Sequence, residues 1–360
     1  MSDLPEADRL EGWPHPREAT ELVGHAAAEE TLLRAVNTRL PHAWIFGGLK
    51  GIGKATLAWR LAKALLAHGR SPAPLATLET DPAHPAVRRV LSGGHADLLS
   101  LKRPTDPKTG KLKGDLTVDE IRRLGDFFSR HAGEGGRRIA IVDAADDLNR
   151  NAANALLKTL EEPPEHVKFI LATTDPQKIP VTVLSRCLQF NLKQMPLGHI
   201  VDHLGHVLAA EQVPCEAAAL RHIAKAAAGS MRDALSLLDQ AIAHGAGRVE
   251  EAGVRDMLGT VGDDYLYALL DALAADDAAA LLAVADRMEA RSLSFESTLQ
   301  ELATLFHRIA LLQFAPSALT DEAEIARLQP YAAVFEAEFL QLCYQIAIHG
   351  RDELGLAPDE

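Results

Sequence analysis

The fold of this chain is decided by residues 149–187, which read NRNAANALLKTLEEPPEHVKFILATTDPQKIPVTVLSRC. The first part spaces apolar side chains three and four residues apart, so we expect a short helix that packs on a sheet and ends before Pro163. Residues 168–174 form a nearly continuous apolar run ending in threonines, which is typical of a buried parallel strand with polar residues at the ligand-binding edge. The turn at residues 185–187 presents Arg186, which is suited to reach a phosphate on a neighbouring subunit.

A glycine-rich loop lies earlier in the chain, between an expected strand and an expected helix. The apolar run at residues 43–46 leads into GGLKGIGKAT at residues 47–56, and a helical pattern continues to Leu65. This order is the context that a phosphate-binding loop requires, because backbone N–H groups turn toward phosphate oxygens and a lysine adds positive charge. The alternative is a glycine turn without a ligand. The residues expected to bind the nucleotide here are Gly48, Gly51, Gly53, Lys54, Ala55 and Thr56.

Two positions depart from the pattern of an ATP-hydrolysing site. Ala55 stands where a Ser or Thr hydroxyl usually holds Mg²⁺, and Thr56 points about 100° away around the helix. Residues 137–146 are expected to give a strand that ends in Asp143, which either orients Mg²⁺ or only caps the strand end. Ala144 follows where a glutamate would activate the attacking water. We therefore expect weak or absent ATP hydrolysis by this chain. We also expect no polymerase active site, because the sequence has no pair of catalytic carboxylates in a suitable context.

Residues 149–187 resemble the AAA+ clamp-loader subunits of bacterial DNA polymerase III, through the motifs LLKTLEEPP, LATTDP and SRC. The resemblance implies an α/β AAA+ module, with a parallel sheet and a P-loop, followed by an all-α lid and an all-α collar domain. It implies that Arg186 acts in trans as an arginine finger and that Thr173 and Thr174 lie at the nucleotide. It also implies that Arg232, within GSMRDAL at residues 229–235, reaches the γ-phosphate, while Ser230 caps the helix.

The resemblance also divides the chain. We expect a disordered leader at residues 1–18, an AAA+ nucleotide-binding domain at 19–195, a helical lid at 196–260 and a helical collar for oligomerisation at 261–360. Residues 22–25 (LVGH) are expected either to lie over the adenine or to form a simple helix entry with a glycine turn. The collar is expected to lack the final helix of gamma-type relatives.

The subunit type that the sequence resembles changes along the chain. Residues 15–162 resemble the delta prime subunit, with HPRE, GIGKATLA and no cysteines where gamma-type relatives have a zinc module. Residues 165–360 resemble the gamma/tau subunit, with GSMRDALSL and MLGT. We interpret this mosaic as a fusion or recombination at the shared NALLKTLEEPP block, or as one divergent delta prime lineage.

Composition excludes several other classes. The net charge of -13 argues against a protein that coats nucleic acid by bulk electrostatics, and the lysines of residues 102–115 form a basic loop that is either DNA-facing or simply solvated. There is no apolar run of about 18 residues and the first residues are polar, so we expect no membrane span, no signal peptide and a cytoplasmic location. Cys187, Cys215 and Cys343 lack metal-ligand spacing, so we expect neither a disulfide nor a zinc site.

The expected function is that of a delta prime-type clamp-loader subunit, which helps to load the sliding clamp onto primer-template DNA as part of the nucleotidyltransferase complex of the polymerase. The expected cofactor is ATP with Mg²⁺, and the expected partners are delta and gamma/tau subunits in a hetero-oligomeric ring, the clamp and DNA. The alternatives are a gamma/tau-type ATP-binding subunit, a different AAA+ DNA motor such as a helicase loader or Holliday-junction motor, and a scaffold that binds no nucleotide. The position in the ring, the resting nucleotide state and direct DNA contacts stay open.

Overall fold

The computed structural model describes residues 14–38, 40–69, 71, 73–106, 109–133, 136–259, 262–291, 293–319 and 322–354. The chain forms two compact units. The first comprises Met1–Val207 with Ala227–Leu237, and the second comprises Leu208–Ala226 with Leu238–Glu360.

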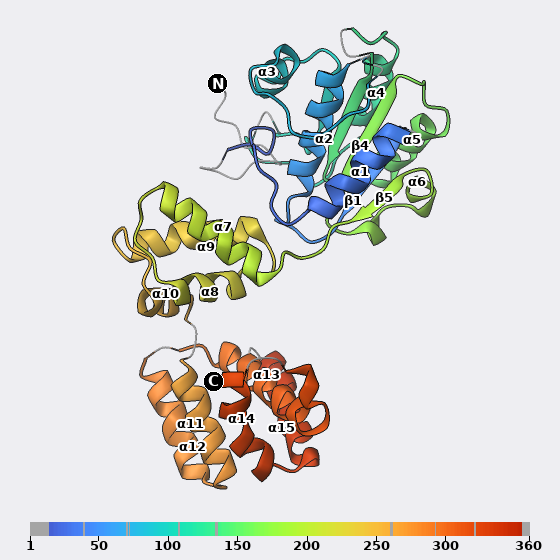
Figure 1. The fold of residues 1–360 in the computed structure, drawn as a ribbon. Coiled ribbons are helices and arrows are strands. Elements are labelled where there is room, and N and C mark those ends of the chain that lie inside the picture. The colour runs from blue at the N-terminus through green and yellow to red at the C-terminus, as the bar shows by residue number, and fades with distance from the viewer. Residues whose placement is uncertain are drawn as a thin grey trace. The chain divides into compact units, whose positions relative to one another are not determined.

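A five-stranded parallel sheet forms the centre of the first unit (Figure 1). Its strands are β1 (Ala43–Gly47), β2 (Leu98–Leu101), β3 (Arg138–Asp143), β4 (Val167–Thr173) and β5 (Leu188–Asn191), in the spatial order β2-β3-β4-β1-β5. The inner strands β1, β3 and β4 are buried almost throughout, as their continuous apolar sequences predict, whereas the edge strand β5 is largely exposed. The register pairs Gly47 with Thr173 and Asp143 with Ala172. The glycine loop, which follows β1, and Asp143, which ends β3, therefore lie at the same edge of the sheet.

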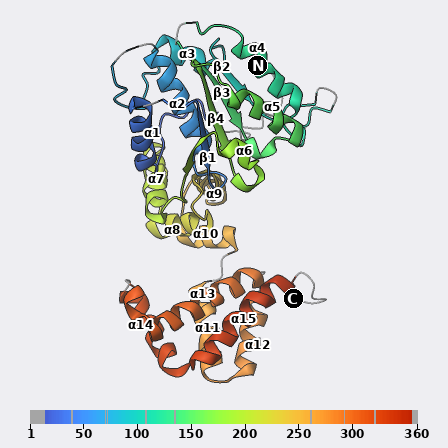
Figure 2. The ribbon, with the colours of Figure 1, turned by 90° about the vertical axis from the view of Figure 1, so that its right-hand side faces the viewer.

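Helices cover both faces of this sheet (Figure 2). On one face lie α1 (Ala26–Thr38), α2 (Lys54–His68) and α3 (Pro85–Leu91), and on the other lie α4 (Val118–Phe128) and α5 (Arg150–Glu161). Alternate residues of a strand point to opposite faces, so Trp44 and Phe46 join the core under α2, while Ile45 joins the core under α5. The connections after β3 and β4 contain the short helices η1 (Ala145–Asp147), η2 (Pro176–Lys178) and α6 (Val181–Leu184).

All remaining elements in the described part of the chain are helical. They begin with α7 (Leu197–Ala210), α8 (Ala217–Ala226), α9 (Met231–His244) and α10 (Glu251–Leu258). The second unit continues with α11 (Asp263–Ala274), α12 (Ala278–Glu289), α13 (Phe295–Phe314), η3 (Pro316–Ala318), α14 (Glu322–Val334) and α15 (Ala337–Glu353), and its core includes Leu270, Phe306, Ile309, Leu328 and Leu340. An α/β module followed by helices alone is the predicted fold class, which is therefore confirmed. The exact domain limits stay predictions.

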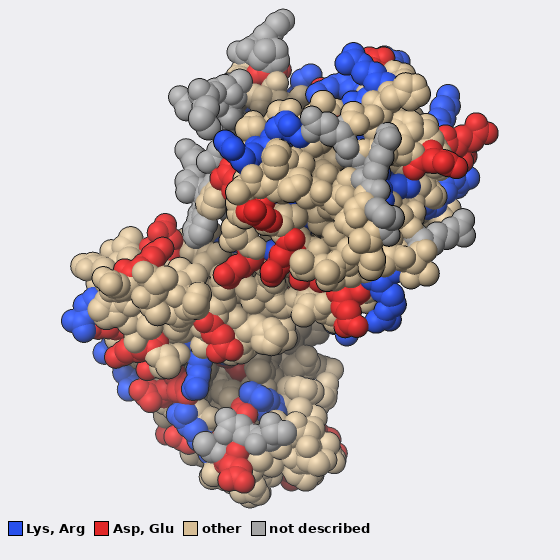
Figure 3. Space-filling view, turned by 45° about the horizontal axis from the view of Figure 1, so that its top comes forward, with Lys and Arg blue, Asp and Glu red and all other residues tan. Residues whose placement is uncertain are grey.

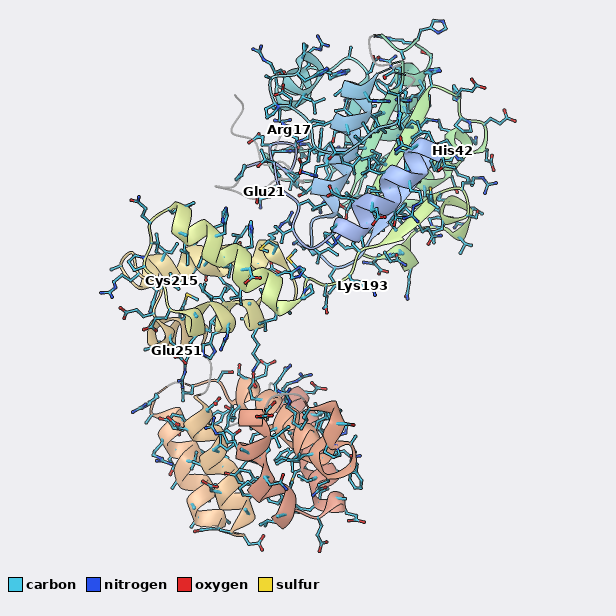
Figure 4. The ribbon with its side chains drawn as sticks, in the orientation of Figure 1. Arg17, Glu21, His42, Lys193, Cys215 and Glu251 are labelled. Carbon is cyan, nitrogen blue, oxygen red and sulfur yellow. The ribbon has the colours of Figure 1, made fainter. Side chains whose placement is uncertain are left out.

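Residues 14–18 differ from the predicted disordered leader, because they pack on α2. His15 is 1% exposed, and its ring meets the ring of Trp59 edge-on with 5.4 Å between centroids. The ammonium of Lys63 donates a hydrogen bond to the backbone oxygen of Arg17 at 2.9 Å (Figure 4 labels Arg17). A buried ammonium needs such partners, and this segment supplies them. Residues 1–13 of the predicted leader lie outside the described residues.

The surface agrees with a protein of mixed charge. On the face shown in Figure 3, acidic and basic side chains are interspersed, without one broad basic area. No helix in the described ranges is both long and apolar enough to cross a membrane.

Candidate nucleotide site and exposed arginine

The predicted phosphate-binding loop connects β1 to α2 along a path that needs glycine. Gly48, Gly51 and Gly53 have φ angles of 140°, 81° and 103°, which L side chains rarely adopt. A Cβ atom on Gly48 would also lie 2.6 Å from the backbone oxygen of Leu192. The glycines are therefore required by backbone conformation and by the close approach of the chain after β5.

Lys54 begins α2, and its ammonium turns back into the loop. Its Nζ atom donates hydrogen bonds to the backbone oxygens of Gly48 at 2.7 Å and Leu49 at 2.6 Å. Burial lowers the pKa of Lys54 to about 8; the negative charges of Asp143 and Asp146 oppose this, and the positive charge of Arg232 adds to it. Lys54 is thus mostly protonated at neutral pH, and any phosphate placed at the loop would favour its charged form.

Ala55 and Thr56 follow Lys54 on α2, and both are half-buried. The methyl group of Ala55 packs against the core under α2. Alanine has no hydroxyl, and the absence of this Mg²⁺ ligand from the site stays a prediction.

The threonines at the end of β4 are held by an aspartate that the sequence analysis did not single out. Asp146 accepts hydrogen bonds from the backbone nitrogen of Thr174 at 3.0 Å and from its hydroxyl at 2.6 Å. Burial would raise the pKa of Asp146, but hydrogen bonds from Thr174 and Thr173 outweigh it and the pKa lies below its usual value. The strand predicted to end in Asp143 does end there, and Asp146 belongs to η1 and accepts hydrogen bonds from Thr174 beyond the end of β4. The signal in the sequence was the second acidic position of DAADD, residues 143–147.

The start of α9 lies against the glycine loop. The backbone nitrogen of Arg232 donates a hydrogen bond to the backbone oxygen of Gly51 at 3.2 Å, and a Cβ atom on Gly51 would collide with the hydroxyl of Ser230. Ser230 also accepts a hydrogen bond from the backbone nitrogen of Asp233 at 3.2 Å, as expected of a helix N-cap. The predicted γ-phosphate arginine, Arg232, therefore lies beside the phosphate loop, and its contact with nucleotide stays a prediction.

Residues 22–25 also meet the loop. The Nε2 atom of His25 lies 2.6 Å from the backbone oxygen of Ile52, and His25 is 6% exposed. A Cβ atom on Gly53 would lie 2.9 Å from the Leu22 side chain. Residues 22–25 therefore pack on the phosphate-binding loop and also form the glycine turn before α1, with Gly24 at a φ angle of 81°; their contact with adenine stays a prediction.

Arg186 is presented after α6, as predicted from the SRC motif, and is partly exposed. Its Nη1 atom donates to the backbone oxygen of Thr182 at 2.8 Å and to the hydroxyl of Ser185 at 3.3 Å. Its Nη2 atom donates to Glu161 at 3.2 Å, forming an ion pair with 35% of the arginine side chain and 46% of the glutamate side chain exposed. None of these partners belongs to the glycine loop, so the chain has two separate candidate phosphate-interacting regions.

Two further sets of polar residues lie outside these regions. A cavity of about 420 Å³ lies between the segment before α1 and the face of α7, lined by Glu21, Val23, His199, Asp202, His203 and His206 (Figure 4 labels Glu21). The basic loop begins a small hairpin through the Thr105–Leu112 bridge, and its Arg103 pairs with Asp147 at 2.9 Å. Within the described ranges no group of three or more His, Cys, Asp or Glu side chains has metal-binding geometry, and the three cysteines are free thiols.

The fold and loop together define a nucleotide-binding module of the AAA+ class. Three family models match successive parts of the chain. Residues 25–196 match the model described as "DNA polymerase III, delta subunit", residues 199–247 match "DNA polymerase III clamp loader subunit, ATPase lid domain", and residues 249–360 match "DNA polymerase III subunits gamma and tau domain III".

Relatives extend over nearly the whole chain. The DNA polymerase III subunit tau of Escherichia coli is 39% identical over 348 residues, which cover 96% of this chain and 52% of the relative. The DNA polymerase III subunit gamma of Buchnera aphidicola subsp. Baizongia pistaciae is 35% identical over 328 residues, covering 89% of this chain and 85% of the relative. The chain thus spans about half the length of the first relative and most of the second. The Thermotoga maritima RuvB branch migration motor, a solved structure, is 17% identical with a TM-score of 0.46, covering 73% of this chain and 85% of that one.

The chain belongs to the DNA polymerase III gamma/tau family of clamp-loader subunits. The predicted clamp-loader resemblance is confirmed. The change from a delta model to lid and gamma/tau models agrees in direction with the predicted change of resemblance, although it falls at residues 196–199 and not at 162–165. Because both relatives named above are gamma or tau subunits, they support the gamma/tau alternative better than the delta prime interpretation.

Proposed function

We propose that this chain is a gamma/tau-type clamp-loader subunit that binds ATP at its glycine loop and contributes Arg186 to the nucleotide of a neighbouring subunit. The observation that carries the proposal is the placement of the Lys54 ammonium inside a loop of glycines with positive φ angles, where it interacts with the charges of Arg232, Asp143 and Asp146. Such a loop, at the N-terminus of a helix, attracts a polyphosphate through backbone N–H groups, the helix dipole and the lysine charge.

The proposed subunit binds ATP better than it hydrolyses it. Mg²⁺ would be oriented by the Asp143 carboxylate through water, because Ala55 offers no hydroxyl. Ala144 provides no carboxylate to activate a water. These two absences also favour the second candidate, a delta prime-type subunit, which the delta model over residues 25–196 supports.

The proposed setting follows from the family. The partners would be the delta and gamma/tau subunits of a hetero-oligomeric ring, the sliding clamp and primer-template DNA, and the work would take place in the cytoplasm. Arg186 supports this arrangement because it is partly exposed and its hydrogen-bond partners lie outside the chain's own glycine loop. An arginine in such a position serves a neighbour better than its own nucleotide.

The test is ATP binding by the isolated chain, measured by calorimetry. Lys54→Ala should weaken binding about tenfold or more, since it removes a charge that lies at the phosphates. Lys50→Ala is the matched control, because Lys50 lies on the same loop and is exposed. It should change the affinity by less than about twofold. Absence of ATP binding by the wild-type chain, or equal losses in the two variants, would contradict the proposal and favour a scaffold.

A further inference from the structure

Arg186 is already bound to an anion of its own chain. The Glu161 carboxylate, at the last residue of α5, accepts a hydrogen bond from the Nη2 atom of Arg186 at 3.2 Å. A carboxylate at the C-terminal end of a helix is disfavoured by the helix dipole, so Glu161 gains nothing from its own helix. Its described partner is Arg186, whereas the adjacent Glu162 is exposed and makes no ion pair with any described residue.

The donors of Arg186 separate into two groups. The Nη1 atom is anchored to the backbone oxygen of Thr182 and the hydroxyl of Ser185. A guanidinium has five N–H donors, so the edge formed by Nη2 and Nε is the part left for a second, incoming anion. Glu161 accepts from Nη2, which is one of the two atoms of that edge. A phosphate that binds this edge with two hydrogen bonds therefore competes with the glutamate for Nη2.

The backbone of Arg186 is held independently of Glu161. Its nitrogen donates to the backbone oxygen of Val183 at 3.1 Å. The Arg186 backbone also faces His42, which precedes β1 (Figure 4), and opposes the burial that lowers the pKa of His42. Removal of the Glu161 charge therefore leaves the backbone and the Nη1 side of the arginine in place.

We propose that Glu161 is a positioning residue for Arg186, whose carboxylate holds the guanidinium on the chain's own surface and releases it to a nucleotide phosphate of the neighbouring subunit. This inference rests on the proposed role of Arg186 as an arginine finger. The exchange is easy because an exposed ion pair contributes little to stability, while a phosphate carries more charge and accepts two hydrogen bonds from one guanidinium edge. Glu161 and the neighbour's ATP thus compete for the same arginine.

The experiment uses a clamp-loader complex reconstituted from this chain and the other subunits of the same organism. Glu161→Gln keeps the shape of the side chain and removes its charge. It should lower the KM for ATP about two- to fivefold, the range that an exposed ion pair allows, and leave kcat within about twofold. Glu162→Gln is the matched control, since it removes the same charge one residue away, and it should leave both constants unchanged.

The same change in an Arg186→Ala background gives the decisive comparison. There Glu161→Gln should have no effect on KM, because the competing arginine is gone. An unchanged or raised KM in Glu161→Gln, or an equal fall in Glu162→Gln, would overturn the inference. If Arg186→Ala alone leaves the ATPase unchanged, the arginine-finger role itself fails, which is a different result from the failure of Glu161. Equal thermal unfolding midpoints of the two glutamine variants would exclude a folding defect.

Discussion

The glycine loop and the turn after α6 that presents Arg186 each carry a positive charge, but they hold it in opposite ways. Lys54 is 7% exposed and is held by backbone oxygens of a loop that only glycine can form. Arg186 is partly exposed and is held mostly by side-chain and local backbone contacts. Burial makes the lysine charge depend on its surroundings, whereas an arginine stays charged at any ordinary pH.

This difference assigns the two regions different work. The loop site lacks a hydroxyl at Ala55 and a carboxylate at Ala144, so it suits nucleotide binding better than hydrolysis. The arginine needs no metal ligand or general base from its own chain, because the role proposed for it in a neighbour's site is to stabilise charge. Changes at the loop should thus affect this chain's own nucleotide, and changes at Arg186 should affect only the assembled complex.

The largest effect is expected for Arg186→Ala. The variant should fold normally and bind ATP as the wild type does, while ATP hydrolysis in the reconstituted complex should fall about 10³-fold at the sites that this arginine faces. Steady-state ATPase measurements test this. Arg130→Ala, at an exposed arginine after α4, serves as the control and should be neutral. An ATPase rate in Arg186→Ala equal to that of the wild type would show that Arg186 has no part in ATP hydrolysis.

A substitution that strains the backbone of the glycine loop should instead disrupt the chain's own nucleotide site. Gly48→Ala would place a Cβ atom 2.6 Å from the Leu192 oxygen at a φ of 140°, so it should abolish ATP binding and lower the free energy of unfolding by about 2 kcal/mol or more. Denaturant unfolding followed by tryptophan fluorescence measures this in the first unit, because the three tryptophans all precede Gly69 in the chain.

The control for that experiment is another glycine. Gly125 is exposed on α4, and a Cβ atom there would meet nothing within 4 Å. Gly125→Ala should therefore stabilise the first unit by about 0.5–1 kcal/mol, as expected for alanine in a helix interior. Similar losses in the two variants would mean that the loop conformation is not specially constrained.

Local pattern predicted the parts of the site that depend on neighbouring residues in sequence. The apolar run before GGLKGIGKAT and the run KFILATT both became inner strands, because a strand buried on two faces must be apolar throughout. The order of strand, glycines and lysine likewise placed Lys54 at the start of α2. These features need no knowledge of the fold beyond their own segment.

Contacts between distant segments were not predicted. Asp146 was given no role from the sequence, yet it accepts two hydrogen bonds from Thr174, which lies 28 positions further along the chain. The pair of Glu161 and Arg186 joins residues 25 positions apart and depends on the turn at α6. Periodicity contains no information on such pairs, because they are fixed by strand register and by the path of the connecting loop.

The pH dependence of ATP affinity gives a smaller but sharper contrast between the two regions. Burial lowers the pKa of Lys54 to about 8, and a bound phosphate favours the charged lysine, so ATP binding above pH 8 requires proton uptake. Affinity should therefore fall as pH rises, by about tenfold between pH 7.5 and 9. Calorimetry on the isolated chain measures this fall, and Lys54→Arg should remove it because arginine keeps its charge. Parallel slopes in the wild type and in Lys54→Arg would show that another group titrates, and that the Lys54 ammonium is not the charge that the phosphates meet.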